Sequence, residues 1–169
     1  MTSRTQRDWL GLAGWVGISL AAGALGGLAS RNAPALYAQL ELPVWAPPSW
    51  VFGPVWTVLY VLMGVAAWLV WREDISGDLR VIASRRRGLA VFGAQLVVNA
   101  LWTWLYFAWR QGALAFADIV LLCVLIVVLM GLFANVRRRT AWLLMPYLAW
   151  VIFASALTWW TWRNNPDLL

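Results

Sequence analysis

Residues 113–135 read ALAFADIVLLCVLIVVLMGLFAN and contain one charged side chain, that of Asp118. A helix rises about 1.5 Å per residue, so roughly twenty such residues reach across the ~30 Å hydrocarbon layer of a bilayer. An apolar stretch of this length is typical of a transmembrane helix. We therefore predict that residues 113–135 cross a membrane.

Four similar apolar stretches lie on either side of this one. They cover about residues 9–28, 49–71, 88–108 and 140–162. Hydrophobic residues make up 63% of the 169-residue chain and charged residues 12%, against about a quarter charged in ordinary soluble domains. The sequence predicts an all-α integral membrane protein, a bundle of five transmembrane helices that forms a single domain over residues 1–169.

The first apolar stretch has an alternative interpretation. Arg4 and Arg7 precede it, and Ala29 and Ser30 follow it, which is the pattern of a cleaved signal peptide. The apolar core is longer than the ~7 to 15 residues of a typical signal. We therefore favour a transmembrane span.

The arginines are unequally divided between the two sides of the predicted bundle. The side that holds the amino terminus has Arg4, Arg7, Arg72, Arg80, Arg85, Arg86, Arg87, Arg137, Arg138 and Arg139. The other side has Arg31, Arg110 and Arg163. By the positive-inside rule, the amino terminus is cytoplasmic, and the carboxyl terminus and the proline-rich loop at residues 29–48 lie outside. This orientation explains the net charge of +6 better than nucleic-acid binding does.

The composition also excludes several kinds of chemistry. The chain has no histidine, and Cys123 is its only cysteine. These are the usual ligands of zinc, copper and non-haem iron, so we predict no metal site. The histidine base on which serine and cysteine nucleophiles commonly depend is also missing. Conventional acid-base catalysis is not expected.

Tryptophan occurs fifteen times, and we expect two different roles for these residues. An aromatic belt at the membrane interfaces explains Trp9, Trp68, Trp71, Trp109, Trp142, Trp159 and Trp162. Others fall on single helix faces at the end of the bundle predicted to be external. These faces hold Trp50, Trp56 and Tyr60; Gln95, Asn99, Trp102 and Tyr106; and Trp150, Ala154 and Leu157. We predict that they enclose an aromatic-walled cleft suited to a flat hydrophobic ligand.

Asp118 is the one acidic residue well inside an apolar stretch. An ionisable residue within a membrane is a candidate functional residue, and its depth would place it near the predicted cleft. The alternative is a structural carboxyl group, hydrogen-bonded to a neighbour such as Asn99. The sequence leaves both interpretations open.

Three segments resemble the TspO/MBR family of tryptophan-rich sensory and translocator proteins. Residues 42–64, LPVWAPPSWVFGPVWTVLYVLMG, are closely similar to its signature. Residues 95–107, with Asn99 and Trp102, resemble its third helix, and residues 146–165, PYLAWVIFASALTWWTWRNN, resemble its fifth. The segments follow the order and spacing of the family over nearly the whole chain.

The resemblance implies a five-helix bundle, often dimeric, in a bacterial cell membrane, which binds porphyrins such as protoporphyrin IX and requires no cofactor. It assigns ligand contacts to Trp50, Trp56, Asn99, Trp102, Trp150, Ala154 and Leu157. The shared helix face adds Tyr60 to this set, and the depth in the membrane adds Asp118. It also implicates Trp56 and Trp150 in light-dependent porphyrin breakdown, which leaves open whether the protein is an enzyme. Animal members bind cholesterol and benzodiazepine-type drugs. Thr158 and Trp159 break the cholesterol motif of those members, so cholesterol is not expected here.

Three functions remain as alternatives at this point. The first is a porphyrin-binding sensor, in which the lack of histidine favours metal-free porphyrin over haem. The second is a transporter of porphyrins or related amphiphiles, and the third is a purely structural membrane protein. We also predict a homodimer through Ala90 and Ala94, which have small-xxx-small spacing, although these alanines could instead face lipid.

Overall fold

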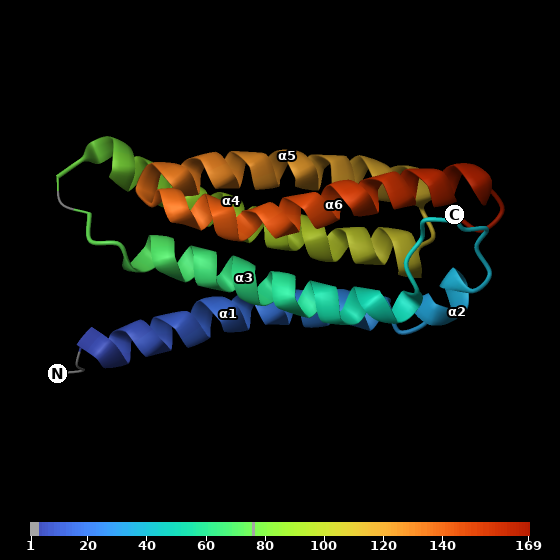
Figure 1. Ribbon diagram of the computed structural model, residues 1–169, viewed down its shortest axis with the longest axis horizontal. Coiled ribbons are helices and arrows are strands. Elements are labelled where there is room, and N and C mark those ends of the chain that lie inside the picture. Colours follow the sequence, from blue (N-terminus) through green and yellow to red (C-terminus); the bar gives the residue numbers. More distant parts are fainter. Residues whose placement is uncertain (1–3, 76) are drawn as a thin grey trace.

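The computed structural model describes residues 4–75 and 77–169 and consists of long, nearly parallel helices (Figure 1). The helices are α1 (Arg4–Ala29), α2 (Ala33–Tyr37), α3 (Phe52–Arg72), α4 (Leu79–Thr103), α5 (Gly112–Val136) and α6 (Arg138–Asn164). A 3₁₀ turn, η1 (Ser49–Val51), leads into α3, and a π-helical turn, η2 (Trp104–Ala108), ends α4.

Five of these helical segments are long and apolar enough to cross a membrane. They are Thr5–Ala29, Ser49–Arg72, Leu79–Ala108, Gly112–Val136 and Arg138–Asn164, and each contains one of the predicted stretches. The predicted fold class is confirmed. The start of α1 and the carboxyl terminus lie at opposite ends of the bundle (Figure 1), as an odd number of crossings requires.

The third span differs from its prediction at its start. Helix α4 begins at Leu79 rather than near Gly88, so the arginines from Arg80 to Arg87 are helical. The Asp78 carboxylate caps this helix by accepting hydrogen bonds from the backbone N–H of Arg80 (2.8 Å) and Val81 (3.4 Å). The hydropathy signal marks only the part of a helix that lies in hydrocarbon, and this helix continues into the polar zone.

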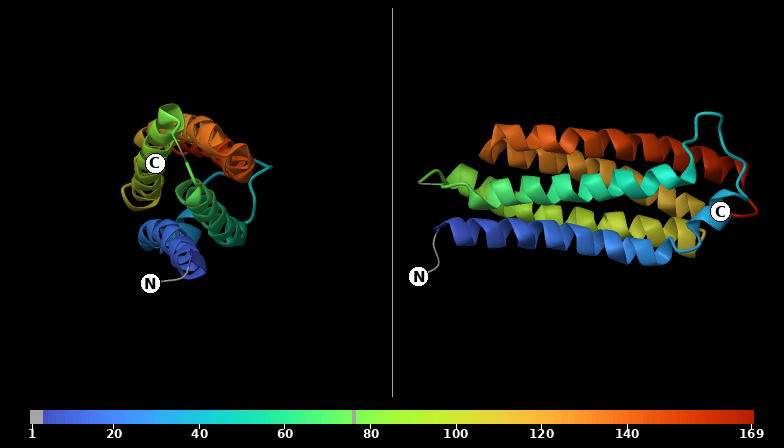
Figure 2. Two further views of the ribbon diagram at one scale, coloured as in Figure 1. Left: turned by 90° about the vertical axis from the view of Figure 1, so that its left-hand side faces the viewer. Right: turned by 60° about the horizontal axis from the view of Figure 1, so that its bottom comes forward.

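Helix packing divides the bundle into two groups (Figure 2). Helix α1 packs on α3, and α5 packs between α4 and α6; α1 also contacts α4, and α3 contacts α6. The first pair is close because Gly64 lacks a side chain: a Cβ there would lie 2.6 Å from the Cα of Val16. This glycine therefore lets the backbones of α1 and α3 come close.

The amino-terminal end of the bundle is tied together by polar contacts. Arg72 forms a salt bridge to Asp8 (3.3 Å), and the indole of Trp68 donates to the Asp8 carbonyl (3.0 Å). A Cβ on Gly11 would strike the ring of Trp71. Trp68 and Trp71 thus pack between α1 and α3, which is a structural role that their prediction as interfacial anchors did not include.

Candidate ligand-binding cavity

A cavity of about 440 Å³ lies in the half of the bundle that faces α2. Its lining is made by α1 (Leu20, Gly23, Ala24, Gly26, Gly27), the following connection (Ser30, Ala33, Pro34, Tyr37, Ser49), α3 (Phe52, Gly53, Trp56, Thr57, Tyr60), α4 and η2 (Asn99, Trp102, Thr103, Tyr106, Phe107) and α6 (Ala154, Leu157, Thr158). Its size is within the range of small-molecule sites, roughly 300 to 1,000 Å³. In the described part of the chain, no charged side chain lines it.

Aromatic rings form two of the cavity walls. On α4 and η2, Trp102 stacks on Tyr106 with ring centroids 5.4 Å apart and meets Phe107 edge-on at 5.8 Å. On α3, Trp56 lies beside Tyr60 at 5.6 Å. Such faces are suited to a flat apolar ligand.

Glycines of α1 supply the space opposite these rings. A Cβ on Gly23 would lie 2.5 Å from the Tyr60 ring, and one on Gly26 would lie 2.9 Å from Oγ1 of Thr103. At Gly27 nothing lies within 4 Å of the Cβ position. The first two glycines let α1 approach α3 and α4, and the third leaves part of the cavity open.

A chain of buried hydrogen bonds forms the floor. The Tyr60 hydroxyl donates to Oδ1 of Asn99, whose Nδ2 donates to the Tyr147 hydroxyl (3.2 Å). Tyr147 in turn donates to Oε1 of Gln95 (2.7 Å). Tyr60 and Asn99 line the cavity, whereas Tyr147 and Gln95 are completely buried beneath it. The network fixes the polar groups that a ligand would meet at the deep end.

The connection between α1 and α3 covers the other end. The Tyr37 hydroxyl donates to the Pro47 carbonyl (2.8 Å), and Asn165 exchanges two hydrogen bonds with the backbone of Glu41 (2.8 and 3.1 Å). Burial raises the pKa of Tyr37 above its ordinary value of 10.0. Its hydroxyl therefore keeps its proton, and this hydrogen bond, at neutral pH.

The cavity is most open along the seam between α1 and α3. The exposed members of its lining that belong to α1 and α3 are Leu20, Ala24 and Gly27 of α1 and Gly53 and Thr57 of α3. Small side chains frame this seam. An apolar ligand dissolved in the bilayer would meet the cavity from this side.

Most of the predicted binding residues meet at the cavity. Trp56, Tyr60, Asn99, Trp102, Ala154 and Leu157 line it. The three helices α3, α4 and α6 bring these side chains together, which is the convergence that the helix-face argument predicted. Whether they bind a ligand stays a prediction.

Trp50 and Trp150 do not line the cavity. Trp50 lies in the 3₁₀ turn before α3 and is 73% exposed, because α-helical spacing does not hold there. Trp150 contacts Phe52 (5.8 Å) and lines an apolar groove on the far side of α3 and α6 together with Pro54 and Phe153. At its depth the interior is filled by Tyr147, which lies 6.2 Å from Trp56.

Asp118 also lies outside the cavity, because none of α5, all of which is described, lines it. The side chain is 8% exposed, and its Oδ2 has no hydrogen-bond partner in the described chain. Asn99 bonds Tyr60 and Tyr147 instead. The proposed pairing of Asp118 with Asn99 is therefore wrong.

Several residues of the site had no place in the sequence argument. Tyr147 joins the floor network, Phe52 separates the cavity from the groove of Trp150, and Tyr37 holds the cover. Glycines 23, 26 and 27 also line the cavity. Tyr147 precedes Ala154 by seven residues, so the helix face that holds Ala154 could have indicated that Tyr147 also points inward.

Comparison with known proteins identifies one family over most of the chain. The TspO/MBR family profile matches residues 15–163. The chain is 36% identical to the tryptophan-rich protein TspO of Chlorobaculum tepidum over 93% of this chain and 97% of that protein. It is 35% identical to protein CrtK of Rhodobacter capsulatus over 86% of each chain, and 36% identical to the human translocator protein over 76% of this chain and 74% of that protein.

These matches cover the spans that build the cavity, and they confirm the resemblance seen in the sequence. The chain therefore belongs to the TspO/MBR family.

Proposed function

We propose that this protein is a porphyrin-binding sensory protein and that its cavity binds metal-free protoporphyrin IX. The observation that supports this most directly is the cavity itself, which is about 440 Å³, walled by Trp56, Trp102 and Tyr106, and neutral. Stacking on these faces favours a planar conjugated ring. The absence of histidine from the chain removes the common axial ligand of haem iron, so iron adds little affinity.

The neutral lining also orients the ligand. An ionised carboxylate buried without a cationic partner is strongly disfavoured, and no cation lines the cavity in the described chain. The two propionates of the porphyrin therefore stay near the cover or the open seam, and the apolar edge enters first. The indole Nε1 of Trp102 is buried and unpaired among the described residues; a ligand that turns this ring could accept its hydrogen bond.

Light-dependent breakdown of the bound porphyrin is the chemical part of this proposal. Illuminated porphyrin transfers its excitation energy to O₂, which adds both atoms across the C2=C3 bond of an indole or across a bridge of the macrocycle. No proton or external electron is required. Trp56 lines the cavity, whereas Trp150 lies behind Phe52, so of these two indoles Trp56 is expected to react first.

The test is a titration of the purified protein with protoporphyrin IX, followed by quenching of tryptophan fluorescence and then by illumination. Trp56→Phe should weaken binding roughly tenfold, as loss of a stacking wall implies, and slow photobleaching of the ligand. Trp142→Phe, at an exposed site (68%) on α6, is the matched control. If Trp56→Phe, Trp150→Phe binds and degrades the porphyrin as the parent does, the assigned site is wrong.

We also propose that the amino terminus lies in the cytoplasm of a bacterial cell, as the arginine distribution implies. Transport is less well supported, since the carboxylate that would couple it, Asp118, does not line the cavity. Proton-driven porphyrin flux in proteoliposomes that is lost in Asp118→Asn would reverse this preference.

A further inference from the structure

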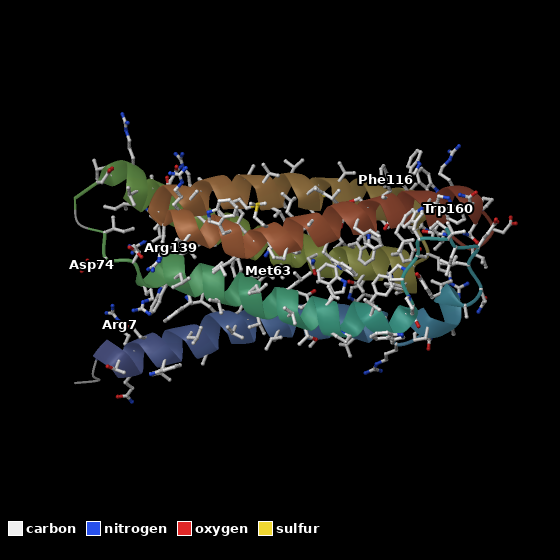
Figure 3. The ribbon with its side chains drawn as sticks, viewed as in Figure 1. Arg7, Met63, Asp74, Phe116, Arg139 and Trp160 are labelled. Atoms are coloured by element: carbon white, nitrogen blue, oxygen red, sulfur yellow. The ribbon has the colours of Figure 1, made fainter. Side chains whose placement is uncertain are left out.

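Two groups of arginines meet at the end of the bundle opposite the cavity. Arg85, Arg86 and Arg87 lie in the first part of α4, and Arg137, Arg138 and Arg139 join α5 to α6. We refer to these six residues as the arginine cluster. Figure 3 shows Arg139 at the same end as Arg7 and Asp74, far from Trp160.

Glu73 brings the two groups together. Its carbonyl accepts a hydrogen bond from Nη1 of Arg85 (3.3 Å), and its carboxylate forms a salt bridge to Nη1 of Arg137 (2.9 Å). Close packing of α4 on α5 supports the same arrangement, since a Cβ on Gly88 would lie 2.9 Å from the Phe133 ring. The cluster is thus one surface made from three segments of the chain.

The charge of this surface is only partly compensated. Among the described residues, ion pairs form between Arg137 and Glu73 and between Arg72 and Asp8. The carboxylate of Asp78 caps α4. Arg86, Arg87, Arg138 and Arg139 are exposed, and none of them has an ion-pair partner in residues 4–75 or 77–169. Four neighbouring guanidinium groups remain available to anions.

The start of α6 adds to this positive potential. The first amides of a helix have no intrahelical acceptor, and the helix dipole is positive there. The N-cap of α6 is Arg137, which makes no capping hydrogen bond through its side chain. The positive end of the helix and the arginines beside it attract an anion together. The geometry therefore favours a phosphate-sized anion at this place.

The depth of the surface indicates the source of that anion. The cluster directly adjoins the apolar parts of the spans at Gly88, Val136 and Thr140. Trp142, one helical turn beyond Arg138, is 68% exposed, and Leu79, at the start of α4, is 79% exposed. Apolar side chains exposed beside arginines are typical of the headgroup zone, where anionic lipids meet basic side chains.

We propose that the arginine cluster binds the phosphate group of an anionic phospholipid, such as phosphatidylglycerol, in the leaflet at the amino-terminal side. Arg86 and Arg87 contact the phosphate from α4, and Arg138 and Arg139 contact it from the start of α6. Arginine suits this role because its planar fork binds phosphate oxygens in pairs. The acyl chains then lie along Trp142. The site is separate from the porphyrin cavity and does not depend on its function.

The test uses the full chain in neutral detergent micelles and dansyl-labelled phosphatidylglycerol, with energy transfer from tryptophan to dansyl as the signal. Dansyl-labelled phosphatidylcholine has the same chains without net charge. We expect preference for phosphatidylglycerol over phosphatidylcholine. Near a membrane surface each arginine strengthens binding of an anionic lipid roughly fivefold. Two double variants each remove two arginines: Arg86→Gln with Arg87→Gln, and Arg138→Gln with Arg139→Gln. Each double variant should weaken phosphatidylglycerol binding more than tenfold.

Two further variants control for folding and for bulk charge. Arg138→Lys, Arg139→Lys keeps the charge and should retain part of the preference. Arg31→Gln, Arg163→Gln removes the same charge at the opposite end and should leave binding unchanged. Equal loss in this last variant, or an equal affinity for both lipids in the unaltered protein, would overturn the proposal. Competition by 10 mM inorganic phosphate, beyond that of chloride at matched ionic strength, would identify a free-anion site and would also overturn it.

Discussion

At the scale of single residues, Gly23 controls how far the Tyr60 ring can enter the space between α1 and α3. We predict that Gly23→Leu destabilises the protein by about 1 to 3 kcal/mol, the typical cost of overpacking, because even its Cβ would lie 2.5 Å from that ring. Displacement of Tyr60 would also break its hydrogen bond to Asn99. Thermal unfolding in detergent and the porphyrin titration measure the two effects.

Gly27 provides the matched control for this substitution. It also lines the cavity, but nothing lies within 4 Å of its Cβ position. Gly27→Leu should therefore not lower the unfolding temperature, because leucine also has a higher helix propensity than glycine. If both variants lose the same stability, the added bulk on α1 rather than contact with Tyr60 is the cause.

A substitution at Tyr147 tests whether the hydrogen bonds beneath the cavity contribute to protein stability without contributing to ligand binding. Its hydroxyl bonds both Asn99 (3.2 Å) and Gln95 (2.7 Å), so Tyr147→Phe leaves two buried amide groups short of a partner. We predict a loss of about 1 to 2 kcal/mol, with less than a threefold change in porphyrin affinity, because Tyr147 does not line the cavity. A large affinity change with unaltered stability would contradict this division of roles.

At the scale of elements, the structure shows which features of the helices hydropathy can predict and which it cannot. The apolar stretches predicted the existence of every span because burial in lipid requires them. The start of α4 was not predicted, since Arg80 and its neighbours are polar and the cap at Asp78 lies outside the hydrocarbon. The direction of Trp150 was also not predictable from spacing. The spacing of residues fixes the direction of a side chain around the helix axis. Which side chain fills the interior at a given depth, here Tyr147, depends on how the helices cross.

The cap of α4 can be tested directly. We predict that Asp78→Ala removes the hydrogen bonds to the backbone N–H of Arg80 and Val81 and costs about 0.5 to 2 kcal/mol of local helix stability. Hydrogen exchange at residues 79–85 should then accelerate several-fold, while exchange in α5 stays slow. Asp74→Ala, which removes an equal charge without removing a cap, should have no such effect. Equal acceleration in both variants would mean that charge, not capping, holds this helix start.

At the scale of the whole molecule, one face of α4 has the small residues that packing against a second copy of the chain would require. Ala90 and Ala94 are both exposed on α4, and nothing lies within 4 Å of the Cβ position of Gly93 between them. Close approach of two backbones in a bilayer needs such small residues, because packing replaces the hydrophobic effect as the driving force. We therefore predict that Ala94→Cys, in a Cys123→Ser background, forms a covalent dimer when native membranes are oxidised. A disulfide requires Cβ atoms about 3.8 Å apart, so random collisions should give little product. Val127→Cys on α5, an equally lipid-accessible site (55% exposed), measures that background. A dimer band no stronger than that of Val127→Cys would mean that these alanines face lipid, and that a second copy, if it binds, uses another face of the bundle.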